Sequence, residues 1–353
     1  FGGGFVLFLA LFFAHYAGYD LPIPGSRTAL FLVAGAVLLV ASLAGAPAGG
    51  AAPRFSWALT AILAAVAMLP LARPAIAPAF APAFAKEKVP RSGSRPARDL
   101  DSGPIRVVTF NLHAGFDEAG GFALDEMLFA LRREDPDVVA LQEVSRGWVI
   151  NGSADLYELA REVLGLEGVP GPSVVPDWGS AVFTRWPAKA SRLEPLPPPD
   201  LPLPRSATLV DLGAIRVLAT HFHHRRDDDH VREEQASFVA GELVAPSDTA
   251  PSILLGDFNA LPESRCLAIL ADAGWRDVFD GSDGAADIDA GTGTYPSRAP
   301  VRRIDTIFFR GPWRLVRAEV APPWGSDHRA VVAELLLEPR LERASLDGSG
   351  TSP

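Results

Sequence analysis

The sequence predicts an α+β domain, built from mixed β-sheets covered by helices and preceded by transmembrane α-helices. From Ile105 onward, short β-rich runs alternate with helical patterns, in both hairpin and crossover relation. The chain has 353 residues with 48% hydrophobic content and a mean hydropathy of +0.16, and most of the excess lies before residue 85. A stretch rich in Pro, Ala and basic residues separates the two parts.

The first part contains three apolar runs, over residues 5–14, 29–46 and 57–71. The second run approaches the roughly 17–25 residues that a bilayer span needs. We therefore predict a membrane segment over residues 1–75 with about three transmembrane helices, and an integral protein of the cell membrane. Buried core helices are the alternative. Because Phe1 stands inside apolar sequence, there is room for further spans upstream.

Residues 76–103 are predicted to be a linker, residues 104–338 a folded domain and residues 339–353 a disordered tail. The first 100 residues carry eight Arg or Lys and three Asp or Glu, a net charge of +5. Because the whole chain has a net charge of −10, residues 101–353 have a net charge of −15. A strongly acidic domain lacks the basic surface that binds long stretches of nucleic acid, so nucleic acid is the less favoured partner.

The folded domain begins with a βαβ unit. Residues 105–111 form a strand that ends in polar groups, residues 123–135 have helical spacing up to Pro136, and residues 137–144 form the next strand. A helix over 153–166 follows, with Ser153 as its expected N-cap. Strands are then predicted over residues 179–187, 206–213 and 214–222.

A helix over residues 227–244 begins with acidic residues, which suit the positive end of its dipole. Residues 251–260 then read as a buried strand and residues 263–274 as a helix that buries Cys266. The last two strands are expected over residues 302–310 and 329–338. Cys266 is the only cysteine, so the chain has no disulfide framework.

Polar residues stand at five strand ends, where packing of the strands would bring them to one edge. They are Asn111, Glu143, His221, Asp257 with Asn259, and Asp327 with His328. Because residues two apart on an extended segment share a face, we expect Asp257 and Asn259 to emerge together.

These residue types indicate hydrolysis of a phosphate ester. Glu143, Asp257 and Asp327 are hard oxygen ligands, which suit Mg²⁺ or Mn²⁺ better than zinc. His221 and His328 are suited to bind a phosphoryl group and to hold a proton. No Ser or Cys lies beside a plausible base, so water is the expected nucleophile.

Six motifs carry a resemblance to a known family: VTFNLHAG, LQEV, THF, LLGDFNA, RIDTIFF and GSDHRAV. In order and spacing they resemble the endonuclease/exonuclease/phosphatase family, the DNase I-like metal-dependent phosphodiesterases and phosphomonoesterases. The resemblance covers residues 104–338. It implies a four-layer αββα sandwich with the active site at one edge of the paired sheets, in a monomeric catalytic domain.

The resemblance also implies roles at the metal and the water. Asn111 and Glu143 would hold the metal, with Glu143 as the principal ligand. Asp327 would join the metal or polarise its water. Asp257 would orient and deprotonate the attacking water.

Other residues would bind the phosphate. Asn259 and His221 would contact it, and Arg205 lies where the family often places a phosphate-binding arginine. His328 would stabilise the transition state, held in its tautomer by Asp305.

Two segments go beyond these motifs. Arg146, Trp148 and Asn151 follow Glu143 and are expected in a substrate-shaping loop. The turn with His223, His224 and His230 is more typical of a solvated face than of a transition-metal site. Both segments resemble a branch of the family attached to multispan membrane segments, including the catalytic domain of eukaryotic proteins that remodel GPI lipid anchors.

Three functions remain open from the sequence. The first is a membrane-anchored, Mg²⁺- or Mn²⁺-dependent phosphoesterase acting on a small or lipid-borne phosphate ester, the second a nuclease, and the third a catalytically silent membrane scaffold. Basic residues in the linker favour a cytoplasmic domain, whereas the GPI-remodelling resemblance favours the opposite side, so the side stays open.

Overall fold

The computed structural model describes residues 99–100, 102–243, 250–281, 287–289 and 293–338. The predicted membrane runs, almost all of the predicted linker and the predicted tail lie outside these residues. Within them, no helix is both long and apolar enough to cross a membrane.

One mixed sheet has seven strands in the order β10-β12-β13-β1-β2-β4-β3. The central strand β1 runs parallel to β2 and antiparallel to β13. The strand bounds are β1 Ile105–Asn111, β2 Val138–Ser145, β3 Glu167–Val175, β4 Trp178–Thr184, β10 Asp287–Asp289, β12 Trp313–Val320 and β13 Val331–Leu337.

The second mixed sheet has six strands in the order β5-β6-β7-β8-β11-β9. Here β8 runs parallel to β7 and antiparallel to β11. The strand bounds are β5 Ala190–Leu196, β6 Arg205–Asp211, β7 Arg216–His221, β8 Ser252–Asp257, β9 Arg276–Asp277 and β11 Asp305–Arg310.

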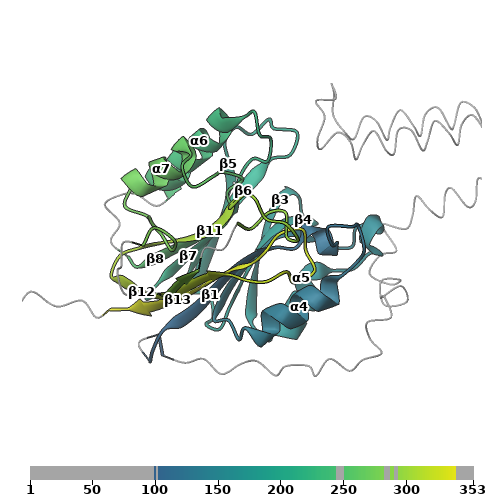
Figure 1. Cartoon of the computed structure of the whole chain (residues 1–353), viewed down its shortest axis with the longest axis horizontal. Coiled ribbons are helices and arrows are strands. Elements are labelled where there is room, and N and C mark those ends of the chain that lie inside the picture. The colour runs from purple at the N-terminus through teal and green to yellow at the C-terminus, as the bar shows by residue number, and fades with distance from the viewer. Residues whose placement is uncertain (1–98, 101, 244–249, 282–286, 290–292, 339–353) are drawn as a thin grey trace, which may run out of the picture. The chain divides into compact units, whose positions relative to one another are not determined.

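Helices cover the outer faces of the two sheets (Figure 1). The helices α4 (Leu124–Arg133) and α5 (Leu156–Leu164) pack on the seven-stranded sheet. On the six-stranded sheet lie α6 (Asp229–Phe238), which continues as a π-helical turn over Val239–Leu243, and α7 (Arg265–Asp272). Two 3-10 turns, His113–Gly115 and Val149–Asn151, complete the described helical elements.

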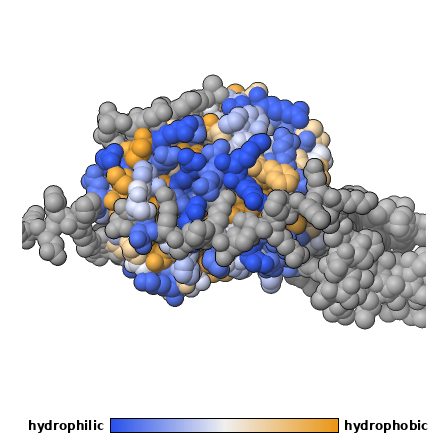
Figure 2. Space-filling model, turned by 90° about the horizontal axis from the view of Figure 1, so that it is seen from below, coloured by the Kyte–Doolittle hydropathy of each residue, from blue (hydrophilic) through white to orange (hydrophobic). Residues whose placement is uncertain are grey.

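Three hydrophobic clusters form the core: one lies under each pair of helices, and the third lies between the inner faces of the two sheets. Neighbouring residues of β8 divide between two clusters, since Ile253 and Leu255 face the other sheet and Leu254 faces the helices. A strand buried on both faces needs a continuous apolar run, which explains the sequence of β8. This arrangement fits the expected four-layer αββα sandwich. The surface that faces the viewer in Figure 2, which shows the molecule from below, is mainly hydrophilic, with smaller hydrophobic areas.

Five of the described strands were not predicted from the sequence. Strands β9 and β10 have only two and three residues, too few for a two-residue alternation to be recognised. The edge strands β3 and β5 contain prolines, which are tolerated at a sheet edge but look like loop in a sequence. In β12 a bulge between Leu315 and Arg317 interrupts the two-residue alternation.

The expected N-cap of α5 was wrong. Asp155, not Ser153, caps the helix, and its carboxylate accepts a hydrogen bond from the Glu158 N–H at 3.1 Å. Ser153 lies in the preceding turn with φ 62°. Ser and Asp are equally good caps, so only the backbone conformation selects between them.

Strand register brings polar side chains together at one end of the six-stranded sheet. Asp257, the last residue of β8, pairs with His221 on β7 and with Asp305 on β11. Gly256 precedes Asp257, and β7 lies so close there that an added Cβ would be 2.9 Å from the Thr220 carbonyl carbon and nearer still to its oxygen. A side chain at this position would force β7 and β8 apart beside the polar cluster.

We expect Gly256→Ala to lower the free energy of unfolding by about 1–3 kcal/mol, because the new methyl group overpacks a site bounded by backbone. Chemical denaturation checks this. The matched control is Gly241→Ala, where an added Cβ meets nothing within 4 Å. Equal stability of the two variants would contradict the close approach of the strands.

Candidate active site

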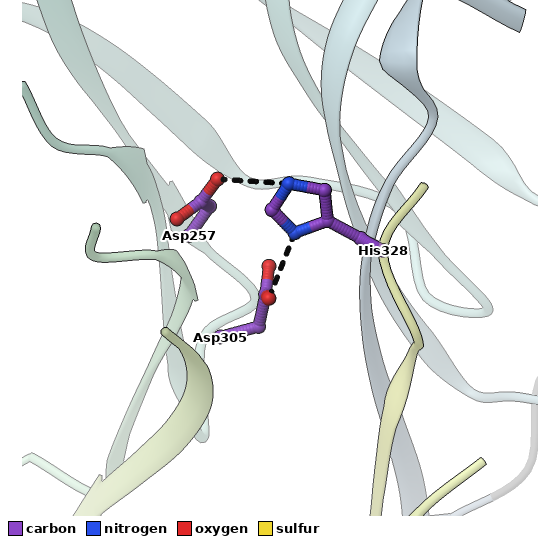
Figure 3. A group of neighbouring side chains, drawn as sticks. All are labelled: Asp257, Asp305 and His328. Atoms are coloured by element: carbon purple, nitrogen blue, oxygen red, sulfur yellow. Dashed lines mark hydrogen bonds and ion pairs between the residues drawn. The ribbon is translucent and has the colours of Figure 1, made fainter. Parts of the chain in front are cut away.

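Three buried side chains form the centre of the polar cluster (Figure 3). His328 Nδ1 lies 2.9 Å from Asp305 Oδ2, and His328 Nε2 lies 3.8 Å from Asp257 Oδ2. Asp257 and Asp305 are 1% and 0% exposed. The two carboxylates come from adjacent strands, whereas His328 precedes β13 of the other sheet.

The charges in this cluster depend on one another. Burial raises the pKa of Asp257 to about 7, with the neighbouring Asp305 carboxylate as the next cause and His328 opposing. Burial alone would lower the pKa of His328, but Asp305 outweighs it, and with Asp257 and Asp327 it raises that pKa to about 10. His328 is therefore a cation at neutral pH. Its Nδ1–H donates to Asp305, so its Nε2–H faces Asp257.

The second histidine of the site, His221, differs from His328 in its charge state. Its Nε2 lies 3.4 Å from Asp257 Oδ2, and its Nδ1 lies 3.3 Å from Nη1 of Arg205. Because a guanidinium only donates, His221 Nδ1 must accept, and the ring proton is on Nε2. Burial, followed by the charge of Arg205, holds the pKa of His221 well below its usual value. His221 is thus a neutral N–H donor aimed at the centre of the site.

Arg205 is 2% exposed and lies behind His221. Its Nη2 also lies 3.3 Å from His224 Nδ1, and its guanidinium stacks 5.7 Å from the ring centre of Trp178. In this position Arg205 orients His221. Direct contact of Arg205 with a phosphate, expected from the resemblance, remains a prediction.

An amide joins two carboxylates on the other side of Asp257. Asn111 Nδ2 lies 3.3 Å from Glu143 Oε1 and 3.1 Å from Asp257 Oδ2. Glu143 has φ 56° and sits where the register of β2 and β4 shifts between Leu141 and Val144. The bulge turns the Glu143 carboxylate toward Asn111.

The residues present fit a hard divalent cation. Glu143 and Asp257 place oxygens on either side of one amide, and Asp257 is a buried carboxylate drawn toward protonation. A divalent cation favours the ionised form of such a group. Ligand atoms of Asp257, Asp305 and His328 also lie within 4.8 Å of one another, but the Asp305–His328 hydrogen bond already engages two of them. Glu143 and Asp257 are thus the better candidate ligands.

Asp327 lies at the rim of the cluster. Its Oδ1 is 3.5 Å from His113 Nδ1 and 3.3 Å from Ser326 Oγ. Its charge contributes to the raised pKa of His328. His113 therefore borders the site, while the role of Asp327 at a metal stays a prediction.

The backbone at Asn259 differs from the extended conformation that we predicted. Strand β8 ends at Asp257, and Asn259 has φ 50°, so the two residues do not share the face of an extended strand. Instead Asp257 Oδ1 accepts from the Asn259 N–H at 2.9 Å, and Asn259 Nδ2 donates to the Phe222 carbonyl at 3.2 Å. The left-handed turn that Asn tolerates holds Asn259 beside β7.

The loop after Glu143 is held together by its own side chains. Arg146 pairs with Asp155 at 3.0 Å, and buried Asn151 donates to Ser145 Oγ at 2.6 Å. Trp148 stacks on Trp178, with ring centres 6.1 Å apart. The expected contacts of Arg146, Trp148 and Asn151 with substrate remain predictions.

The His-rich turn is less solvated than the sequence suggested. His223 is 1% exposed and its Nε2 lies 2.9 Å from Asp228 Oδ2. His224 is half-buried against Arg205, and only His230 is exposed. His223 thus packs inside the turn rather than on its surface.

Sequence analysis missed three residues beside the cluster. The Tyr295 ring lies 4.9 Å from the His328 ring, and the charges of Arg226 and Arg302 both act on Tyr295. Arg302 immediately precedes the RIDTIFF motif and Arg226 lies in the turn after THF. An arginine in a charged turn gives no signal of a site until the strands are assembled.

The Endonuclease/Exonuclease/phosphatase family model matches residues 108–328. No curated protein sequence matches the chain. Similar folds have been solved: an endonuclease/exonuclease/phosphatase from Beutenbergia cavernae has a TM-score of 0.55 and 24% identity over 67% of this chain and 72% of that one.

Two further structures share the fold. An endonuclease/exonuclease/phosphatase from Bacteroides vulgatus has a TM-score of 0.55 and 20% identity over 67% of this chain and 99% of that chain. A mannosyl-6-phosphatase from Bacteroides thetaiotaomicron has a TM-score of 0.52 and 20% identity over 65% and 99%.

We expect Asp305→Asn to lower the pKa of His328, because the variant removes the carboxylate that keeps the buried imidazole charged. The proton would then leave His328 at a lower pH than in the wild type, where its pKa is raised to about 10. NMR titration of the His328 ring in metal-free protein measures the shift. Asp277→Asn, which removes a carboxylate that bonds Arg303 and Thr306, is the control. An unchanged pKa in Asp305→Asn would contradict the ion pair.

We expect Arg205→Met to release the tautomer of His221, since Nδ1 would lose the guanidinium that makes it an acceptor. Ring nitrogen shifts should show an unprotonated Nδ1 in the wild type and a mixture of tautomers in the variant. A single Nε2–H tautomer in both proteins would show that Arg205 does not set it.

Proposed function

Because the chain belongs to the endonuclease/exonuclease/phosphatase family, we propose that it is a membrane-anchored, divalent-metal-dependent hydrolase of a small or lipid-borne phosphate ester. Members of this family are hydrolases that act on phosphate esters. The observation that carries the proposal is the position of Asp257, a buried carboxylate with a raised pKa between a neutral and a cationic histidine.

Asp257 is suited to activate a water molecule. Its pKa of about 7 lies near neutral pH, where a general base is most effective. Asn259 and Asn111 bond the two oxygens of this carboxylate and fix its orientation. A water on Asp257 would therefore be held in one position and lose its proton to the carboxylate as it attacks phosphorus.

The two histidines would stabilise the charge that develops on the phosphoryl oxygens. His328 carries a full positive charge on a ring held by Asp305, and His221 offers a neutral N–H held by Arg205. Donors that are already oriented do not have to reorganise during the reaction, which makes their electrostatic effect large. His328 also has a proton to give.

Glu143 and Asp257 would hold the divalent cation, with Asn111 and Asp327 nearby. Bound Mg²⁺ or Mn²⁺ would supply charge neutralisation of the phosphate oxygens and of the leaving group. We favour these ions because carboxylate oxygens are the donors available there. The side chains of the chain then supply the base, the acid and the orientation.

The proposal of a membrane anchor rests on the three apolar runs within residues 1–75. A membrane location would bring the domain to lipid-borne substrates. We expect the catalytic domain to be monomeric. The net charge of −15 on residues 101–353 disfavours a long polyanion, so we place nucleic acid behind a small or lipid-borne ester. One solved structure of the same fold is a mannosyl-6-phosphatase, which is consistent with a small phosphate ester.

We expect Asp257→Asn and His328→Ala each to lower kcat for bis(p-nitrophenyl) phosphate by about 10²–10⁴-fold, as loss of a general base or acid does. Release of p-nitrophenol measures the rate. The controls are Asp272→Asn, whose carboxylate is exposed and pairs with Arg265, and His230→Ala, which is also exposed. Wild-type turnover in either site variant would overturn the mechanism.

We expect chelation to abolish this activity and Mg²⁺ or Mn²⁺ to restore it, because the carboxylates need a cation to bind the substrate phosphate. Glu143→Gln should need at least about tenfold more metal for half-maximal activity, as loss of a charged ligand does. Full activity in the presence of a chelator would contradict metal dependence. Plasmid DNA assayed in parallel with phospholipids and sugar phosphates separates the nuclease from the favoured function.

A further inference from the structure

Two arginines lie on the Tyr295 side of the cluster. Arg302 pairs with Tyr295 in an isolated antiparallel bridge, with hydrogen bonds of 2.9 Å and 3.1 Å between the two backbones. The Tyr295 ring in turn lies 4.9 Å from the ring of His328. Thr294 Oγ1 accepts from the N–H of Asp305 at 3.2 Å, so the segment that carries Arg302 is tied to the catalytic strand.

Arg226 comes from the turn that follows His221. Buried Arg232 fixes this turn, donating from Nη2 to the Arg226 carbonyl at 3.1 Å and from Nη1 to the His223 carbonyl at 3.0 Å. The His223 N–H donates to Gln235 Oε1 at 2.9 Å. The backbone of Arg226 is therefore held in place, while its side chain is exposed.

The two guanidinium charges act on each other and on the site. Burial, and next the positive charge of Arg226, lower the pKa of Arg302, while Asp257 opposes the shift. Both arginines also oppose the rise that burial causes in the pKa of Tyr295. Arg226, Arg302, Tyr295 and Asp257 thus lie within electrostatic range of one another.

Neither guanidinium forms an ion pair with a carboxylate of the described ranges. In the described part of the chain, no carboxylate lies within 4.0 Å of either guanidinium, although this domain is strongly acidic. Neighbouring arginines are paired: Arg303 with Asp277 at 2.9 Å, and Arg232 with Asp229. Two like charges placed together without a counterion are unfavourable, and a bound anion would relieve the repulsion.

We propose that Arg226 and Arg302 form a second anion subsite, which binds a phosphate group of the substrate other than the one that is hydrolysed. This inference rests on the proposed function and deepens it. The substrate class is a phosphate ester of a sugar or polyol that carries a second phosphate, either free or as a lipid headgroup. The cation that the carboxylates around Asp257 would hold binds the reacting phosphate. The arginine pair binds the other phosphate.

The surroundings favour a single additional phosphate over a polynucleotide. Asp227, Asp228 and Asp229 directly follow Arg226, and a long polyanion would meet these charges. Nucleic-acid binding needs a run of basic residues along the backbone. Two arginines beside a row of aspartates fit one compact anion.

Binding to the full-length chain tests the subsite without turnover. In an Asp257→Asn background with Mg²⁺, calorimetry compares glucose 6-phosphate with glucose 1,6-bisphosphate, which differ by one phosphate. The lipid arm compares phosphatidylinositol with phosphatidylinositol 4-phosphate in phosphatidylcholine vesicles. We expect the added phosphate to lower Kd by about tenfold or more in at least one pair, the usual effect of a charged hydrogen bond. The pair that shows it identifies the free or the lipid-borne source.

Arg226→Gln and Arg302→Gln should each remove this preference, while Arg298→Gln should retain it. Arg298 lies on the same segment but is 65% exposed and faces Asp117. Equal Kd values within both pairs, or a preference that survives in the double variant, would overturn the subsite. Weakened binding of a single-stranded oligonucleotide in the arginine variants, with no preference in either pair, would overturn the sugar or polyol class and favour a nuclease.

Kinetics separates this inference from the proposed function. With an intact Asp257, Arg302→Gln should lower kcat/KM for bis(p-nitrophenyl) phosphate, which has no second phosphate, by clearly less than the loss of about tenfold or more expected for the preferred bisphosphate. A lack of turnover in the wild type would overturn the proposed function alone, since the binding preference does not depend on it. A large loss of kcat in Arg302→Gln would show that Arg302 acts on the reacting phosphate and would overturn its assignment to a second one.

Discussion

The site depends on one interaction, the ion pair between His328 and two buried carboxylates. Asp257 and Asp305 are register partners on β8 and β11, so the fold places two acidic groups side by side in its interior. Such an arrangement is unfavourable unless a cation lies between them. His328 supplies this cation from the other sheet, and the same contact joins the two sheets at the edge that carries the candidate site.

Backbone irregularities at the strand ends aim the other groups. Glu143 sits in a bulge with φ 56°, and Asn259 sits in a left-handed turn with φ 50°. Gly256 allows β7 to approach so closely that His221 and Asp257 face each other. Regular strands would alternate these side chains between faces, and the irregular positions instead turn them toward one point. Such strained positions are typical of functional sites, where the surrounding fold maintains them.

The two histidines differ in charge because their second partners differ. Burial lowers the pKa of both imidazoles, but Asp305 accepts from His328 and outweighs burial there, whereas Arg205 donates to His221 and adds to the effect of burial. The centre of the site therefore contains one cationic and one neutral N–H donor around a single carboxylate, Asp257. The proposed arginine pair adds positive charge on the side of Tyr295, while the net charge of the domain is negative. This local contrast would favour a compact anionic substrate.

The sequence by itself identified most of the residues that meet in the candidate site. Asn111, Glu143, His221, Asp257 and His328 were recognisable because each follows or precedes an apolar run, and a residue at a strand end is visible in a local pattern. The alternation of strands and helices likewise predicted mixed sheets with helical covers, and the family resemblance implied that the sheets are paired. Edge strands with prolines and the bulged strand β12 were missed because they break that local pattern.

Only the tertiary structure decided how these groups act. Strand register, which no local pattern encodes, made Asp305 the neighbour of Asp257, and the packing of the two sheets placed His328 against both. Assembly also turned Arg205 into the partner of His221 and brought Arg226 toward Arg302, although 76 positions separate the two arginines along the chain. Charge states and subsites depend on distances between segments far apart in sequence, because electrostatic interaction follows separation in space.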